Sequence, residues 1–172
     1  MGLCTKALIN KVICEETVTL TRLDHNVPIG NIPAPRGSEL SGQTSISVLD
    51  CTPLFKDGKL GLQISLFVQE ELYLTTPQGS DFPLEFGFRF QDFAPLTDCE
   101  QVIGLEDIIG ELDCRIISLS GSNQLTLHDD RTFDQFLEIS IQVRLLQESQ
   151  IQIALCPPYS IPCEEVSSKI GV

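Results

Sequence analysis

Cysteine is the residue type with the most conspicuous chemistry in this sequence, which contains seven of them. They are Cys4, Cys14, Cys51, Cys99, Cys114, Cys156 and Cys163. Their spacings are wide and irregular, without a Cys-x-x-Cys pair, so neither a zinc ribbon nor a thioredoxin-type redox site is indicated. Because the number is odd, at least one thiol stays unpaired within the chain or pairs with another chain.

Cys51 and Cys114 lie in apolar, strand-like runs, where we expect buried thiols that pack as small hydrophobic residues. Four cysteines lie in the terminal segments, where disulfide bonds to a neighbouring chain are more favourable: Cys4, Cys14, Cys156 and Cys163. Together with Cys99, these four are the candidates for disulfides or cross-links. The sequence leaves the connectivity open, because spacing alone does not determine which cysteines meet.

Groups that titrate near neutral pH are scarce, since the two histidines are His25 and His128. His25 lies in a Pro-rich segment, whereas His128 begins the run HDDR, with Asp134 shortly after it. An imidazole and carboxylates close together can bind a metal ion, but we interpret this run as a hairpin loop with solvated charges. No His-Glu-x-x-His, Gly-x-Ser-x-Gly, phosphate-binding loop or EF-hand pattern occurs. We therefore predict no catalytic, metal-binding or cofactor-binding residues, no enzymatic activity and no small-molecule substrate.

The formal net charge is −13, and it is unevenly distributed. Residues 1–60 carry six basic and six acidic side chains, whereas residues 61–172 carry five basic and eighteen acidic ones. Nucleic acids and anionic membrane surfaces attract basic proteins, so we predict neither as a partner. The sequence has no apolar window long enough for a transmembrane helix and no signal-peptide pattern at its start. Lys6 and Lys11 are candidates for contacts with the acidic part of a neighbouring copy.

The elements that position these residues are predicted to be strands. The run KLGLQISLFVQEELYLTT, residues 59–76, alternates apolar and other residues. Its apolar parity comprises Leu60, Leu62, Ile64, Leu66, Val68, Leu72 and Leu74, interrupted by Glu70. We expect this parity to face the core of the domain. On the other parity, Phe67 and Tyr73 either contact a neighbouring molecule or are covered by the N-terminal segment of the same chain.

Two further runs alternate in the same way, FPLEFGFRFQDF at residues 82–93 and FLEISIQVRLL at residues 136–146. Turn signals separate the predicted strands, notably Asp57-Gly58. Residues 105–112 are compatible with two helical turns, but we predict a strand over 110–119, followed by a turn at residues 121–123. About eight strands result, which predicts an all-β, two-layer antiparallel β-sandwich of jelly-roll-like type.

The expected domain organisation has three parts. Residues 1–42 form an extended N-terminal arm, ending in a hinge with three prolines and three glycines over residues 25–42. Such a composition does not support a long helix and is typical of an extended connector. Residues 43–156 form the β-sandwich body, which we expect residues 151–155 to close, and residues 157–172 form a Pro-broken C-terminal tail.

The central part of the sequence resembles the spore-coat-associated (SPOCS) domain of endospore-forming Firmicutes. The lead-in IGNIPAPRGSEL precedes ISVLDCTPLFKDGKLGLQISLFVQEELYL, and the family similarly has a first strand, a short Asp/Gly turn with Lys, and a long strand ending in an aromatic residue. FPLEFGFRFQDF is similar to the family's aromatic segment and FLEISIQVRLL to its closing strand. The resemblance covers about residues 28–147. The glycine that begins the family's long strand is matched loosely by Gly61, and the cysteine-bearing termini lie outside the domain.

The resemblance implies a structural protein of the spore surface, in the coat, the exosporium or an appendage, made in the mother-cell cytoplasm. Its implied partners are other copies of the chain and other coat proteins, and it implies no catalytic residues. With a strand-forming arm and terminal cysteines, we predict a subunit that assembles into a fibre, tube or sheet by strand exchange and inter-subunit disulfides. The alternative is an adaptor that anchors other coat proteins without polymerising. A glycan-binding module is less favoured, because the chain has no Trp and two Tyr.

Overall fold

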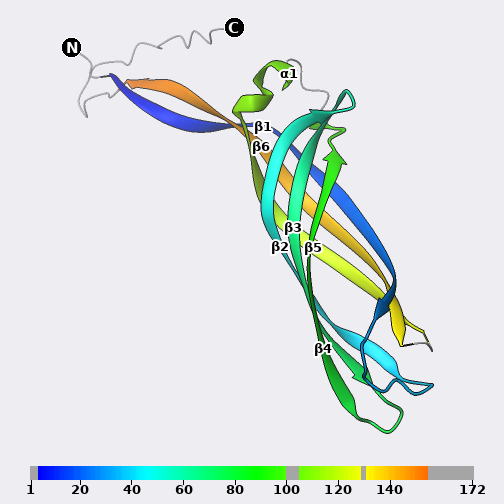
Figure 1. Cartoon of the computed structure of the whole chain (residues 1–172). Coiled ribbons are helices and arrows are strands. Elements are labelled where there is room, and N and C mark those ends of the chain that lie inside the picture. The colour runs from blue at the N-terminus through cyan, green and yellow to red at the C-terminus, as the bar shows by residue number, and fades with distance from the viewer. Residues whose placement is uncertain (1–3, 100–104, 129–130, 155–172) are drawn as a thin grey trace.

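The computed structural model describes residues 4–99, 105–128 and 131–154 (Figure 1). The elements of these residues are, in chain order, β1 (Cys4–Pro28), β2 (Glu39–Lys56), β3 (Lys59–Thr75), β4 (Asp81–Pro95), the helical turn α1 (Leu105–Ile108), the 3-10 turn η2 (Ile109–Glu111), β5 (Leu112–Leu127) and β6 (Thr132–Ala154). The strands are long, and they replace the roughly eight shorter strands that the sequence predicts.

The strands form two antiparallel sheets, with the orders β1-β6-β5 and β2-β3-β4. Figure 1 shows the two sheets lying against each other along the long axis of the molecule, with β1 and β6 continuing past them at one end. The predicted two-layer, all-β sandwich is therefore confirmed. The Asp57-Gly58 turn between β2 and β3 is also confirmed, since both residues adopt the positive φ angles of a tight hairpin turn, 53° and 75°.

The core lies between the two middle strands, β3 and β6. The predicted inward parity of β3 comprises Leu60, Leu62, Ile64, Leu66, Val68, Leu72 and Leu74, and each is at most 1% exposed. β6 supplies the facing layer through Leu137, Ile139, Ile141, Val143 and Leu145, all fully buried. Because side chains alternate between the two faces of a strand, the alternating apolar residues of β3 and of β6 form one apolar row from each sheet, and both rows lie in the core.

Phe86, Phe88 and Phe90 of β4 lie on the inward side of their sheet, as the alternation predicts. Phe86 packs edge-on against Phe133 of β6, with ring centroids 5.6 Å apart. Phe88 and Phe90 pack against the main core and lie beneath the Arg22 guanidinium, whose carbon is 4.4 Å from the Phe88 centroid. A cation over an aromatic face is attracted by the ring quadrupole, so Arg22 covers the apolar row from the opposite sheet.

The expectation of a separate N-terminal arm is wrong for the described residues. β1 pairs with β6 in antiparallel register from Cys4 opposite Ala154 to Pro28 opposite Thr132. Val18 and Leu20 of β1 are at most 4% exposed and belong to the core. The Pro/Gly-rich residues after Pro28 form the crossover from one sheet to the other, which explains their composition without requiring a hinge.

The region after β4 differs from the prediction in two ways. Residues 105–111 are helical, and β5 begins at Leu112 rather than at residue 110. β5 then continues to Leu127, so residues 121–123 lie within the strand and the turn predicted there is wrong. Gly121 is required there for a different reason, because a Cβ atom on it would lie 2.6 Å from Cδ1 of Ile46 on the facing sheet.

Candidate functional site: inter-sheet disulfides, polar network and projecting ribbon

Two disulfides join the sheets, one on each side of the sandwich. Cys14 of β1 is bonded to Cys99, which follows β4, with the two Cα atoms 5.5 Å apart. Cys51 of β2 is bonded to Cys114 of β5, with a Cα separation of 5.8 Å. Since β1 and β4 are edge strands on one side and β5 and β2 on the other, the bonds fix both sides of the sandwich.

These bonds correct the predicted roles of Cys51, Cys114 and Cys14, and they confirm Cys99 as a disulfide residue. Cys51 and Cys114, expected as buried thiols, form a disulfide, because edge strands of different sheets face each other in a way that alternation does not reveal. Cys14 and Cys99 pair within the chain, whereas inter-chain bonding was favoured for Cys14. The backbone of Cys4 lies opposite Ala154 at the end of the β1–β6 pair. Cys156 and Cys163 lie outside the described residues, so their predicted role stays a prediction.

A buried carboxylate positions the Cys14–Cys99 bond. Glu16 of β1 is 8% exposed. Its Oε1 accepts hydrogen bonds from the backbone N–H and the hydroxyl of Thr97, at 2.8 and 2.9 Å. Its Oε2 accepts from the backbone N–H groups of Asp98 and Cys99, at 3.0 and 3.1 Å. Three consecutive N–H groups converging on one carboxylate hold the segment after β4 against β1. Sequence reasoning did not find this contact, because the partners are more than 80 residues apart.

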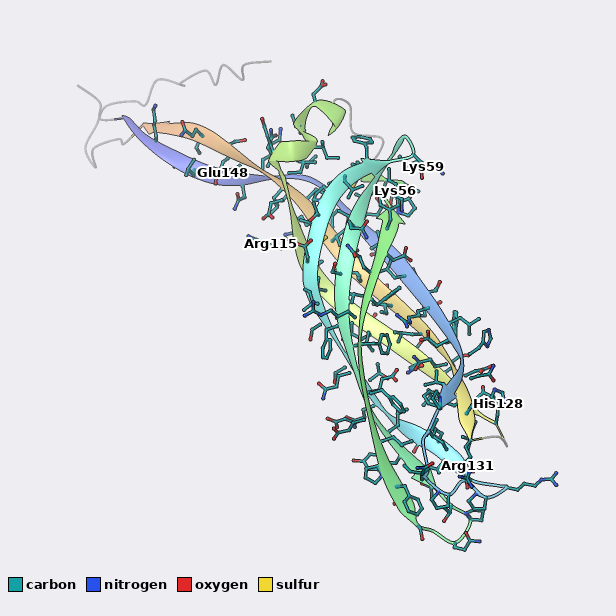
Figure 2. All side chains as sticks on the ribbon, viewed as in Figure 1. Lys56, Lys59, Arg115, His128, Arg131 and Glu148 are labelled. Atoms are coloured by element: carbon teal, nitrogen blue, oxygen red, sulfur yellow. A yellow bond between two sulfur atoms is a disulfide. The ribbon has the colours of Figure 1, made fainter. Side chains whose placement is uncertain are left out.

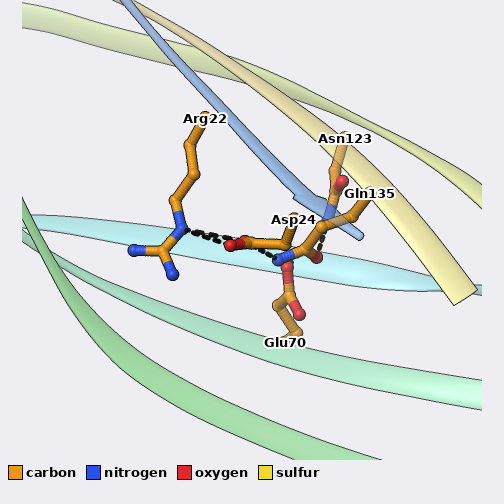
Figure 3. A network of polar contacts seen from close by, with 5 residues as sticks. All are labelled: Arg22, Asp24, Glu70, Asn123 and Gln135. Carbon is orange, nitrogen blue, oxygen red and sulfur yellow. Dashed lines mark hydrogen bonds and ion pairs between the residues drawn. The ribbon is translucent and has the colours of Figure 1, made fainter. Parts of the chain in front are cut away.

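A second polar network lies between the two sheets (Figure 3). Nε of Arg22 donates to both carboxylate oxygens of Asp24, at 3.1 and 2.8 Å, and Nε2 of Gln135 donates to Oδ2 of Asp24 at 2.8 Å. Burial raises the pKa of Asp24, but the hydrogen bonds from Arg22 and Gln135 outweigh it and leave that pKa below its usual value. The Asp24 carboxylate therefore stays ionised and links β1 to β6.

Glu70 and Asn123 extend this network to the facing sheet. Nδ2 of Asn123 lies 2.8 Å from Oε1 of Glu70, 3.2 Å from Oγ1 of Thr44 and 3.4 Å from Oε1 of Gln135. Glu70 is 1% exposed, and burial raises its pKa, aided by the nearby charge of Asp24 and opposed by the hydrogen bond from Asn123. Glu70 is the residue that interrupts the apolar parity of β3 in the sequence.

The network divides the interior into two apolar clusters. The larger contains the even-numbered residues from 60 to 68 of β3 and the odd-numbered residues from 137 to 145 of β6, and the smaller contains Leu72, Leu74 and Phe133. Along β3 and β6 the positions between the clusters are occupied by Glu70 and Gln135. Each of these polar side chains forms hydrogen bonds with residues on another strand, so a slip of register would leave buried polar groups unpaired. The network therefore favours one alignment of the two sheets.

The two histidines meet on one carboxylate at the turn between β5 and β6. Asp134 accepts from Nδ1 of His25 at 3.0 Å, from Nε2 of His128 at 3.1 Å and from the backbone N–H of Asn26 at 2.9 Å. The Asn26 and His25 hydrogen bonds lower the pKa of Asp134 to about 2. Figure 2 places His128 and Arg131 at the end of the sandwich opposite Lys56 and Lys59. Within the described part of the chain, no group of three or more His, Cys, Asp or Glu side chains is arranged to hold a metal ion.

β1 and β6 continue beyond the sandwich as a two-stranded ribbon. β5 begins at Leu112, opposite Gln147, so β6 has β1 as its one described neighbour past this point. We call residues 4–11 and 147–154 the ribbon. Figure 1 shows it projecting from the sheets, and Figure 2 shows Glu148 on it, away from them. Large apolar side chains are exposed on the ribbon, with Leu8 at 62%, Ile9 at 40% and Ile151 at 37%.

The ribbon corrects the predicted end of the body. Residues 151–155 were expected to close the sandwich, but Ile151 lies outside it and residue 155 is not among the described residues. Alternation alone does not distinguish an apolar row that the same chain covers from one that it leaves uncovered.

The structure separates the four predicted assembly residues into two places. Lys6 and Lys11 are exposed on the ribbon. Phe67 and Tyr73 lie on the outer face of β3, where Phe67 is half-buried beside Gly87 and Tyr73 is 47% exposed. The alternative in which the N-terminal segment covers these two aromatic residues is wrong for the described residues, because β1 belongs to the other sheet.

A shallow groove lies between β2 and β5, with a volume of about 180 Å³. Its lining residues are Thr44, Ile46, Leu119, Ser120, Gly121, Ser122 and Leu137. None of these side chains titrates near neutral pH, so the groove offers no general acid or base.

The chain was compared with protein-family models and with curated proteins. No protein-family model matches it, and no curated protein matches it significantly. None of the helical segments among the described residues has the length and apolar character needed to cross a membrane.

Proposed function

We propose that this protein is a structural subunit that associates with other copies of itself, with no catalytic role. The observation that carries the proposal is the ribbon, a paired extension that no other described element covers and that projects from a sandwich fixed by two inter-sheet disulfides. A two-stranded ribbon is marginal in water unless a third element covers it. Its exposed Leu8, Ile9 and Ile151 therefore favour contact with another molecule.

The body suits a building unit. Inter-sheet disulfides on both sides resist separation of the layers, which is useful in a subunit that carries load or meets a harsh exterior. Three of the four edge strands, β1, β2 and β5, contain register shifts, whereas β4 pairs with β3 without one. Bulges discourage unwanted strand addition along an edge, so they favour association at a defined place over random edge pairing.

The cysteines outside the two disulfides supply a second element of the proposal. Cys4 lies at the free end of the ribbon, and Cys156 follows Ala154 closely in the sequence. We propose that Cys4, Cys156 and Cys163 form disulfides between copies. Each bond would form from two thiols, which release two protons and pass two electrons to molecular oxygen or to a small-molecule disulfide that is reduced in turn.

The resemblance to the SPOCS domain supports a location for such a subunit. We propose a layer or appendage of the spore surface, where an oxidising exterior would convert reversible contacts into covalent ones. The adaptor that anchors other coat proteins without polymerising is the second candidate. It is favoured by the exposed Tyr73 on the outer face of β3, which belongs to the sheet that does not contain the ribbon.

Negative-stain electron microscopy of the purified full chain, with and without reductant, tests the proposal. We expect regular fibres, tubes or sheets, and we expect them to withstand denaturant when reductant is absent. Dispersed particles of single-chain size under both conditions would contradict self-association and favour the adaptor.

A further inference from the structure

One face of the ribbon continues the core-facing surface of its sheet. In β6 the inward residues are odd-numbered as far as Leu145. The register shift opposite Leu145 and Leu146 places its extra residue in β1, between Val12 and Cys14, so the alternation of β6 continues into Gln147, Ser149 and Ile151. Opposite them on β1 lie Lys11, Ile9 and Ala7. This face is less exposed than the other one, which carries Leu8, Glu148 and Gln150. The sheet that should cover it, β2-β3-β4, does not extend this far (Figure 1).

We propose that a second copy of the chain covers this face with its own ribbon, and that the two ribbons pack face to face about a two-fold axis. This inference rests on the proposed function and names the surface that would carry it. The contact would replace the missing second layer, since Ala7, Ile9 and Ile151 of each copy would lie against the same residues of the other.

The dimensions of the ribbon select its occupant. Eight residues at about 3.4 Å each and a width of roughly 10 Å give a face of about 270 Å². A stable globular interface needs about 800 Å² on each partner. Because the face is about a third of that area, the contact by itself is weak and reversible. A face two strands wide matches a partner of equal width, and the ribbon of a second copy is such a partner.

Charge selects the antiparallel arrangement. Lys11 lies at the base of the apolar face, and Glu111 is also at the base, where it accepts from Gln147 Nε2 at 3.0 Å. In an antiparallel pair the two Lys11 side chains lie at opposite ends of the contact, and the two acidic bodies lie apart. A parallel pair would instead place Lys11 against Lys11 and bring two bodies of an acidic chain, net charge −13, together.

Site-directed cross-linking of the full chain tests the arrangement. In a background with Cys4, Cys156 and Cys163 replaced by Ser, Ser149→Cys places a thiol on the proposed contact face. Gln150→Cys, its neighbour on the opposite face, is the matched control. A bifunctional maleimide with a spacer of about 10 Å, the spacing of packed sheets, should link Ser149→Cys into dimers and leave Gln150→Cys mostly single.

Adding Ile9→Asp to Ser149→Cys should lower the dimer yield by roughly tenfold, because the contact would bury an unpaired charge. Circular dichroism should show the same β-signal and melting temperature in both proteins, since Ile9 lies outside the sandwich. Equal cross-linking of Ser149→Cys and Gln150→Cys, or an unchanged yield with Ile9→Asp, would overturn the proposal.

Two further results separate this inference from others. Wild-type protein that self-associates in sedimentation while Ser149→Cys gives no dimer would overturn the ribbon pair and leave the proposed function standing. Wild-type protein that stays single as well would overturn both. Val166→Asp with Ile170→Asp in the full chain should leave the cross-linking unchanged. Loss of cross-linking in this variant would indicate that residues 155–172, and not the second ribbon, contact the face.

Discussion

Removal of the Cys51–Cys114 disulfide should weaken the fold strongly, although it removes no apolar residue from the centre of the core. The bond joins β2 to β5, which are edge strands of different sheets on one side of the sandwich. We expect Cys51→Ala with Cys114→Ala to lower the free energy of unfolding, chiefly by releasing the unfolded chain from a large covalent loop.

The loop length sets the expected magnitude. The bonded residues are separated by 63 positions for Cys51–Cys114 and by 85 for Cys14–Cys99. The chain-entropy relation gives about 4.3 kcal/mol for the first bond and about 4.6 kcal/mol for the second at 25 °C. For a domain of this size, a loss of about 4 kcal/mol lowers the melting temperature by about 10 °C.

Denaturant unfolding followed by circular dichroism, without reductant, measures this loss. The variant and its parent both carry Cys4, Cys156 and Cys163 replaced by Ser, so that bonds between copies do not contribute. Peptide mapping of the parent should first show Cys14 bonded to Cys99 and Cys51 to Cys114. A loss below about 1 kcal/mol would refute the reasoning, because an inter-sheet bond closing so long a loop should contribute several times more.

Three carboxylates give further predictions. Glu16→Ala should destabilise the fold by about 3 kcal/mol in denaturant unfolding, because it leaves three N–H groups after β4, that of buried Cys99 among them, without their acceptor. A loss under about 1 kcal/mol would argue against that anchor. Glu70→Gln should be more stable than wild type at neutral pH, since burial raises the pKa of Glu70 and so disfavours its ionised form. The advantage should vanish in acid, where Glu70 is protonated in the folded and the unfolded state. Equal stability at all pH values would contradict this prediction. The pKa of Asp134 falls from its usual 3.8 to about 2, so its contribution is complete above pH 3.8 and is lost as the pH falls through about 2. Asp134→Asn should therefore melt below wild type at neutral pH, and the gap should narrow in acid. A gap as large at pH 2 as at neutral pH would exclude this linkage.

The alternation of the sequence predicted the parts of the fold that depend on neighbouring residues. The inward row of β3 and that of β6 follow from a period of two, because each strand buries one face against the other sheet. The Asp57-Gly58 turn was predictable for the same reason, since its backbone angles are local.

Long-range pairing set the limit of prediction. β1 looked like an arm because its partner, β6, lies at the other end of the sequence. Gly121 looked like a turn, but its missing side chain makes room for Ile46 of the facing sheet. Of the candidate site, the presence of exposed lysines near the N-terminus was predicted, whereas the ribbon was not, because apolar alternation is the same in a covered and an uncovered strand.

Sedimentation velocity of the full-length chain over a wide concentration range, in reductant and without it, tests the central claim most directly. We predict species that grow in mass with concentration in reductant. Without reductant, once cross-links have formed, these species should persist on dilution. A single species of 19.0 kDa at every concentration, with or without reductant, would contradict the claim that this protein is a self-associating subunit.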